Sequence, residues 1–357
     1  MFMDIQQLLQ LTITNKASDL HLLPGVHPAI RVDGVLTYLT NFPVLTRENV
    51  ETMVFSLIIP KQKEIFLNQK ELDFSFGFGG GSYGDLGRFR VNIYFQRGNI
   101  SAEFRFLEPK IRTIEELNMP KKIHDFSDLK QGFILVTGPT GHGKSTTLAA
   151  VINEINQSRN VHILTIEDPI EYVYPPGKSL ISQREMELDT NSWSLALRSA
   201  LREDPDVVLV GEMRDPETIS AAITIAETGH LVFSTLHTNS ASQSIDRIID
   251  SFPASQQAQI RIQLASTLKG IVSQRLLPRI GGGRIPSVEL LIGTSAVASN
   301  VREGKTHLID SIIQNSQDVG MIPLESSLAS LVLSGSISLE TAKSYALRQE
   351  ELQRLIG

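Results

Sequence analysis

The chain has 357 residues, more than one hydrophobic core usually organises, so two domains are expected rather than one. A formal net charge of -6 argues against a broad nucleic-acid surface, and the absence of cysteine excludes disulfides and thiolate metal sites. No segment approaches the roughly 20 apolar residues of a membrane span, and the N-terminus lacks a signal-peptide pattern, so we expect a cytoplasmic protein.

Residues 1–115 are predicted to form an α+β domain. The apolar spacing of residues 4–14 is helical, and residues 46–67 predict two helices separated at Pro60. Short apolar runs predict strands, and the glycines of residues 77–87 predict a flexible hairpin. The predicted strands are residues 19–23, 29–39, 88–96 and 100–107. Residues 116–130 are polar and are predicted to be a linker.

Residues 131–293 alternate apolar strands with helices, which predicts a mostly parallel sheet covered on both faces, the α/β class. The predicted strands are residues 133–137, 161–167, 207–210 and 230–235, and the predicted helices are residues 144–155, 192–202 and 216–228. Residues 294–357 are predicted to be helical, with helices at residues 295–302, 307–315, 324–333 and 339–347.

Residues 138–145, GPTGHGKS, match the phosphate-binding pattern G-x-x-x-x-G-K-[ST] between a predicted strand and a predicted helix. Glycines let backbone N–H groups surround a phosphate, and the helix N-terminus adds a positive dipole. Lys144 is expected to reach the β and γ phosphates of ATP, and the Ser145 hydroxyl to bind Mg²⁺. His142 is expected to face solvent. The predicted nucleotide-binding residues here are Gly138, Thr140, Gly141, Gly143, Lys144, Ser145 and Thr146.

Two predicted strands end in acidic residues. Glu167 ends a buried strand in LTIEDPIE and is a candidate general base for the attacking water, although it could instead solvate a loop. Glu212 follows the apolar run of DVVLVGEMRD, a Walker B arrangement, and is expected to hold Mg²⁺ directly or through water. Arg214 and Asp215 are expected to form an ion pair or to begin a helix before Pro216.

Histidines and arginines supply further candidates. His237 follows a strand at its carboxyl end and could contact the γ-phosphate, whereas His230 lies at the other end, about 15 Å away by strand geometry. In GRFRVNI, alternation places Arg88 and Arg90 on one face of a strand, and Arg105 alternates with phenylalanines in the same way. These arginines could clamp a phosphate or could simply be solvated.

Together these segments resemble the type II/type IV secretion ATPase superfamily, and most closely the PilT-like pilus retraction ATPases. GPTGHGKST, LTIEDPIE, LREDPDVVLVGEMRDPET and TGHLVFSTLHTNSA are similar to that family's Walker A, Asp box, Walker B and His box. ASDLHL, RVDG and GRFRVN are similar to its N-terminal PAS-like domain. The resemblance implies a RecA-like P-loop ATPase core, an N-terminal PAS-like domain and a C-terminal helical extension.

The resemblance also implies roles and partners. Glu167 would be the catalytic base, Glu212 would serve the Mg²⁺ site, and His230 with His237 would be the His-box pair. Arg88, Arg90 and Arg105 would contact ATP between the domains. The chain would form a homohexamer that acts on an inner-membrane pilus platform protein, at the cytoplasmic side of that membrane, without a stable nucleic-acid partner.

One motif departs from the family pattern. The retraction signature AIRNLIRE is matched only loosely by residues 296–303, where Ala298 and Ser299 replace the usual Arg and Asn. A pilus retraction motor is therefore the leading hypothesis, and the alternatives are an accessory retraction paralogue that works with a second retraction ATPase, or a non-motor nucleotide switch. A pilus or secretion assembly ATPase and a nucleic-acid translocase rank lower.

Overall fold

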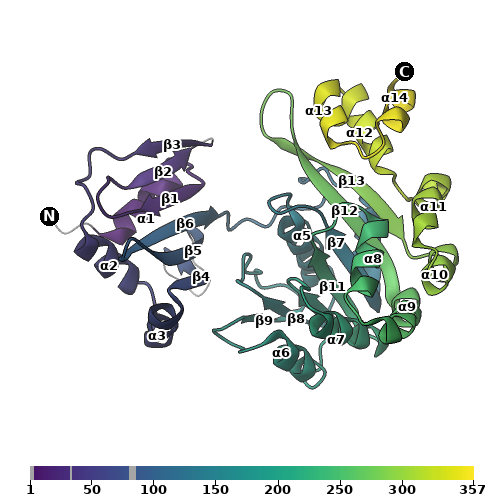
Figure 1. The fold of residues 1–357 in the computed structure, drawn as a ribbon, viewed down its shortest axis with the longest axis horizontal. Helices are drawn as coiled ribbons and strands as arrows, with labels where there is room; N and C mark the ends of the chain where they lie inside the picture. Colours follow the sequence, from purple (N-terminus) through teal and green to yellow (C-terminus); the bar gives the residue numbers. More distant parts are fainter. Residues whose placement is uncertain (1–3, 33, 80–85) are drawn as a thin grey trace. The chain divides into compact units, whose positions relative to one another are not determined.

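The computed structural model describes residues 4–32, 34–79 and 86–357 (Figure 1). Contacts divide the chain into two compact units: unit 1 is Met1–Lys110 with Asp168–Val173, and unit 2 is Ile111–Glu167 with Tyr174–Gly357. The domain boundaries expected from composition stay a prediction.

Unit 1 is an α+β unit. Its helix α1 begins after Asp4, whose side chain accepts a hydrogen bond from the backbone N–H of Gln6, and α3 begins with Pro60, as expected for a residue that lacks an N–H. The elements are α1 (Ile5–Thr14), β1 (Asp19–Leu22), β2 (Ala29–Val32), β3 (Val35–Tyr38), α2 (Arg47–Phe55), α3 (Pro60–Gln69), β4 (Glu71–Phe78), β5 (Gly87–Gln96) and β6 (Asn99–Leu107).

The described strands of unit 1 form one antiparallel sheet in the order β3-β2-β1-β6-β5-β4. In β5 the residues Phe89, Val91 and Ile93 are buried while Arg88 and Arg90 are half-buried, so the predicted alternation is confirmed. Strand β4 was not expected, because its glycine at position 77 belongs to the stretch read as a hairpin. Most of that hairpin, residues 80–85, lies outside the described residues.

Unit 2 begins with two short helical turns, η1 (Lys121–His124) and α4 (Asp125–Asp128). Its strands are β7 (Gly132–Thr137), β8 (His162–Glu167), β9 (Leu180–Glu185), β10 (Val207–Val210), β11 (Leu231–Leu236), β12 (Leu268–Pro278) and β13 (Arg284–Ile292). The helices among them are α5 (Lys144–Ser158), α6 (Trp193–Ala200), α7 (Pro216–Glu227), α8 (Ala241–Asp250) and α9 (Ala254–Thr267).

The strands of unit 2 that the structure describes form one sheet in the order β13-β12-β7-β11-β10-β8-β9. All neighbouring strands are parallel except β12 and β13. Every residue of β7, β10 and β11 is buried, which requires cover on both faces of the sheet. Figure 1 shows β7, β11, β8 and β9 in this order across the sheet, and β10 pairs with both β11 and β8. The predicted α/β core is therefore confirmed.

The last helices of the chain pack in two places. Val297, Val301, Ile309 and Ile313 belong to the main core of unit 2, whereas the helices from Leu324 onward pack on the β12–β13 pair, as Figure 1 shows. These last helices are α10 (Ser295–Arg302), η2 (Thr306–Leu308), α11 (Ile309–Asn315), η3 (Gln317–Val319), α12 (Leu324–Leu333), α13 (Leu339–Tyr345) and α14 (Gln349–Ile356). The carboxylate of Glu325, fully buried on α12, accepts hydrogen bonds from the backbone N–H groups of Leu347 and Arg348 at 3.1 and 2.9 Å. Arg348 also pairs with Asp310, which ties α11, α12 and α14 together.

Candidate functional site

The glycine-rich loop between β7 and α5 has the backbone that a phosphate cradle requires. Gly138, Gly141 and Gly143 have φ of +141°, +79° and +82°, values that residues with a Cβ rarely adopt. A Cβ on Gly141 would meet nothing within 4 Å, so this part of the loop is open to a ligand. Helix α5 begins directly after Gly143, and Ser145 is exposed in its first turn. The loop therefore fits a bound phosphate group.

Lys144 joins this loop to the His box. Its ammonium group donates hydrogen bonds to the carbonyl oxygens of Gly138 and Pro139 at 2.9 and 3.1 Å. It also lies 3.3 Å from Nδ1 of His237, as does the hydroxyl of Thr140. Because an ammonium group can only donate, Nδ1 accepts and the proton of the neutral imidazole lies on Nε2.

His237 also reaches the Walker B segment. Its Nε2 lies 3.6 Å from Oε2 of Glu212, a carboxylate whose other oxygen is 2.7 Å from the guanidinium of Arg214. Burial lowers the pKa of His237, and the nearby charge of Lys144 lowers it further, while Glu212 opposes both. The imidazole is thus neutral at pH 7 and stands between the two nucleotide-binding motifs.

Glu167 is the last residue of β8 and is held by its neighbours. Its Oε1 accepts hydrogen bonds from the Thr165 hydroxyl at 2.7 Å and from the Gln183 amide at 3.3 Å. Gln183 belongs to β9, a strand that the sequence pattern did not predict. Glu167 is also the last residue of unit 2 before the segment Asp168–Val173, which groups with unit 1.

Strand order brings most of the candidates to one edge of the sheet. The loop at Gly138 follows β7, His237 follows β11, Glu212 follows β10, and Glu167 ends β8. These strands are consecutive parallel neighbours, so their carboxyl ends meet where α/β proteins usually bind ligands. His230 lies at the opposite end of β11. Its Nδ1 is 3.0 Å from the carbonyl oxygen of Ile225, so this chain alone does not bring it to the loop.

The expectation that His142 faces solvent was wrong. The imidazole is half-buried, and its Nδ1 accepts a hydrogen bond from the backbone N–H of Leu276 on β12 at 2.9 Å. Its ring centroid lies 6.4 Å from that of Tyr345 on α13. Burial lowers the pKa of His142, and Lys144 adds to this effect. The partner lies 134 positions along the chain, so no local pattern could reveal the contact.

Of the two readings for Arg214 and Asp215, the helix start is observed. Asp215 is the N-cap of α7, accepting hydrogen bonds from the Thr218 backbone N–H and hydroxyl at 2.9 and 2.8 Å. Pro216 occupies the first turn, as N-terminal prolines usually do. Arg214 pairs with Glu212 at 2.7 Å.

Two buried charged residues that no sequence pattern indicated hold the segment after His237. Arg275 on β12 donates to the carbonyl oxygen of Asn239 at 3.1 Å, and Glu289 on β13 accepts from the backbone N–H of Ala241 at 2.6 Å. Burial raises the pKa of Glu289 to about 7, opposed by the hydrogen bond from Ala241 and by the charge of Arg275. Neither residue follows a recognisable motif.

The three candidate arginines lie in unit 1 and have partners there. Arg88 donates to the Ser75 hydroxyl at 2.6 Å and to the carbonyl oxygen of Ile170 at 3.4 Å. Arg90 pairs with Glu171 at 3.7 Å, and Arg105 donates to the buried carboxylate of Asp19 at 2.9 Å. Arg88 and Arg90 thus contact the segment that follows Glu167, whereas Arg105 holds β6 to β1.

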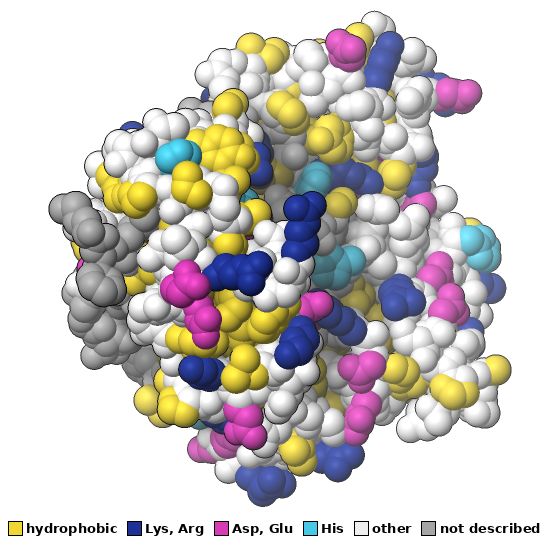
Figure 2. Space-filling view, turned by 60° about the vertical axis from the view of Figure 1, so that its left-hand side comes forward, with side chains coloured by type: hydrophobic (Ala, Val, Ile, Leu, Met, Phe, Trp, Pro, Cys, Tyr) yellow, Lys and Arg dark blue, Asp and Glu magenta, His cyan; other side chains and the backbone are white. Residues whose placement is uncertain are grey.

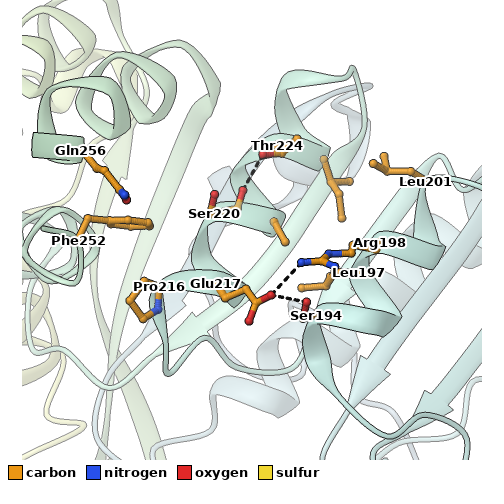
Figure 3. Close-up of a pocket in the computed structure, with 12 residues that line it drawn as sticks. Ser194, Leu197, Arg198, Leu201, Pro216, Glu217, Ser220, Thr224, Phe252 and Gln256 are labelled. Atoms are coloured by element: carbon orange, nitrogen blue, oxygen red, sulfur yellow. Dashed lines mark hydrogen bonds and ion pairs between the residues drawn. The ribbon is translucent and has the colours of Figure 1, made fainter.

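A cavity of about 400 Å³ lies within unit 2, between α6, α7 and the segment that leads into α9. Figure 3 shows Ser194 and Arg198 directed at the carboxylate of Glu217, which accepts hydrogen bonds from both at 2.6 and 3.1 Å. None of its lining residues is a predicted site residue.

Figure 2 shows Lys and Arg side chains spread over the face in view, with Asp and Glu among them.

Comparison of the chain with known proteins identifies its family. Residues 105–318 match the model of the type II/IV secretion system protein family. The chain belongs to this family. It is 47% identical to the type IV pilus retraction ATPase PilT of Pseudomonas aeruginosa over 96% of this chain and 98% of that protein. It is 46% identical to a twitching motility protein of Neisseria gonorrhoeae over 91% of this chain and 86% of that protein.

Solved structures agree. The crystal structure of the pilus retraction motor PilT with bound ADP matches with a TM-score of 0.90 and 45% identity, over 99% of each chain. In the position of the retraction signature, α10 carries Ala298, which packs on the core of unit 2, and Ser299, whose hydroxyl donates to Glu303 at 3.1 Å.

Within the described part of the chain, none of the helices combines the length and apolar character that crossing a membrane requires.

Proposed function

We propose that this chain is an ATP-hydrolysing motor subunit that powers retraction of a type IV pilus. The observation that carries the proposal is the meeting of the phosphate loop, Glu167, Glu212 and His237 at the ends of four adjacent parallel strands. Identity of 47% to a pilus retraction ATPase over 96% of the chain supports the coupling to pilus retraction.

Each side chain has a role that its position supports. Lys144 and the loop N–H groups bind the β and γ phosphates, and the exposed Ser145 hydroxyl, with Glu212 directly or through water, holds Mg²⁺. Glu167 takes a proton from the attacking water, with its carboxylate oriented by Thr165. The bound ATP with Mg²⁺ supplies the phosphoanhydride bond whose cleavage releases the energy.

His237 is suited to report on the γ-phosphate. It contacts Lys144 on one side and Glu212 on the other. A change in either contact would therefore move His237 and the segment that follows β11. A neutral imidazole with its proton on Nε2 can donate to one partner while accepting from the other. The catalytic role of His230 and nucleotide contacts by Arg88, Arg90 and Arg105 remain part of the prediction.

The motor acts as a homohexamer on an inner-membrane platform protein of the pilus machine. This assembly is what the family resemblance implies, and the link to pili is supported by a pilus retraction ATPase and a twitching motility protein among the relatives. In the cell the chain is expected at the cytoplasmic side of the inner membrane, bound through that partner.

Phosphate release by the purified protein tests the catalytic part. We expect wild type to hydrolyse ATP, Lys144→Ala to lose both binding and turnover, and Glu167→Gln to bind ATP but to lose about 100-fold or more in kcat, because a general base contributes on that order. Wild-type protein that binds ATP without turnover would instead identify a non-motor nucleotide switch.

Complementation tests the coupling to pili. We expect the gene to restore twitching to a strain that lacks its retraction ATPase. If wild type fails and Ala298→Arg with Ser299→Asn succeeds, the chain is an accessory paralogue that needs a second retraction ATPase.

A further inference from the structure

The side chain of Gln274, on β12, is buried against the phosphate loop and makes two hydrogen bonds there. It is 3% exposed, its Nε2 donates to the carbonyl oxygen of His142 at 2.7 Å, and its Oε1 accepts from the Thr147 hydroxyl on α5 at 2.7 Å. Both ends of the amide are thus satisfied, which fixes which end is the donor. Burying an amide costs free energy unless each of its polar atoms finds a hydrogen-bond partner. If this position served packing alone, an apolar side chain would therefore suffice.

The hydrogen bond to His142 sets the direction of the next N–H group. In a planar trans peptide the carbonyl oxygen of one residue and the N–H of the following residue point in opposite directions. When Gln274 holds the carbonyl of His142, the N–H of Gly143 points away from β12. This N–H belongs to the last residue of the loop before α5, where loops of this pattern direct N–H groups at phosphate oxygens.

The backbone of β12 supports the same loop at two further points. A Cβ at position 138 would lie 2.2 Å from the carbonyl oxygen of Gln274, so only glycine allows the loop to leave β7 along this path. Two residues beyond Gln274, the N–H of Leu276 donates to His142 Nδ1. One strand therefore fixes the loop at its start, at its middle and, through Thr147, in the first turns of α5.

We propose that Gln274 is a positioning residue for the nucleotide, which orients the peptide between His142 and Gly143 toward the phosphates. The proposal rests on the proposed function, because it requires a nucleotide at this loop. Gln274 touches no reacting atom; it acts through the loop that binds the phosphates.

Gln274→Met tests this role, because it keeps the side-chain volume and removes both hydrogen bonds. We expect the Kd for ADP, measured by calorimetry with Mg²⁺, and the KM for ATP to rise by about 10- to 100-fold, the loss expected for buried hydrogen bonds that shape a site. Since Lys144 and Glu167 are untouched, kcat at saturating ATP should stay within about threefold. A Kd unchanged from wild type, or a loss confined to kcat, would overturn the proposal.

Thr147→Val is the second variant and decides the matter if Gln274→Met does not fold. It removes one hydrogen bond and lets the amide turn, so we expect a rise in the Kd for ADP of about three- to tenfold. Thr267→Val is the matched control, since its buried hydroxyl donates to a carbonyl within α9 at 2.8 Å and should leave the Kd at the wild-type value. Thr147→Val with wild-type affinity would overturn the proposal, whereas wild type that binds no ADP would refute the proposed function itself.

Discussion

Glu289 makes the stability of this protein depend on pH in a direction that a single substitution can reveal. The residue lies on β13 and is 4% exposed, and burial raises the pKa of its carboxyl from 4.5 to about 7. Between these values the unfolded chain has released the proton while the folded chain retains it, so the free energy of unfolding falls as pH rises. The difference between the two pKa values corresponds to a loss of about 3 kcal/mol at high pH.

Glu289→Gln removes the titration and keeps an acceptor for the Ala241 N–H. The new amide changes the free energy of unfolding by an amount that does not depend on pH. The informative quantity is therefore how the difference in this free energy between Glu289→Gln and wild type changes with pH. Relative to wild type, the free energy of unfolding of Glu289→Gln should rise by about 2.5 kcal/mol between pH 5 and pH 8.

Urea unfolding followed by circular dichroism, at one protein concentration, measures this difference at each pH. Gln243→Ala, on the exposed side of α8, alters no ionisable group in the helix whose first N–H group donates to Glu289, and should show a pH-independent difference. A flat difference between Glu289→Gln and wild type from pH 5 to pH 8 would refute the reasoning, because it would mean that the folded state charges Glu289 without cost.

Three further predictions concern local features. Asp215→Ala should lower the free energy of unfolding by about 1 kcal/mol through loss of the α7 cap, with Asp215→Ser largely restoring it in urea titrations. Hydrogen bonding to Glu154 raises the pKa of His124 above 6.5, so the stabilisation of wild type over His124→Gln should be full below pH 6.5 and vanish above the folded pKa; a difference that grows from pH 6 to pH 9 would contradict this. Gly138→Ala should cost about 1–3 kcal/mol more than Gly141→Ala, because its Cβ alone would meet a β12 carbonyl; equal urea midpoints would show that the loop moves freely.

Periodicity predicted the regular parts of the fold and the site residues that adjoin them. The strand 207–210 is apolar throughout, which is why Glu212 could be placed at a strand end. The strand before the phosphate loop is nearly so, which provided the expected context for the motif that identified Lys144. No element was predicted in residues 237–293, where α8, α9, β12 and β13 are found. Strand β12 carries Gln274 and Arg275 among its buried residues, a polar composition that hides a strand.

Those polar residues are the ones that hold the phosphate loop and the segment after His237. A local pattern cannot reveal them, because the partners of Gln274 at positions 142 and 147 lie 132 and 127 residues away. The same reason explains the error over His142. The buried polar residues of β12 therefore indicate a functional role, but this could be recognised only once the strand order was known.

The contacts of His142 impose an order on biosynthesis. The loop that carries it leaves the ribosome well before Leu276, its hydrogen-bond partner 134 positions later, and before Tyr345 near the end of the chain. Domains fold during synthesis as their residues become available. A growing chain therefore contains the phosphate loop long before it contains β12 and α13, which contact His142. The phosphate loop can therefore make its contacts with β12 only after most of the polypeptide has been made.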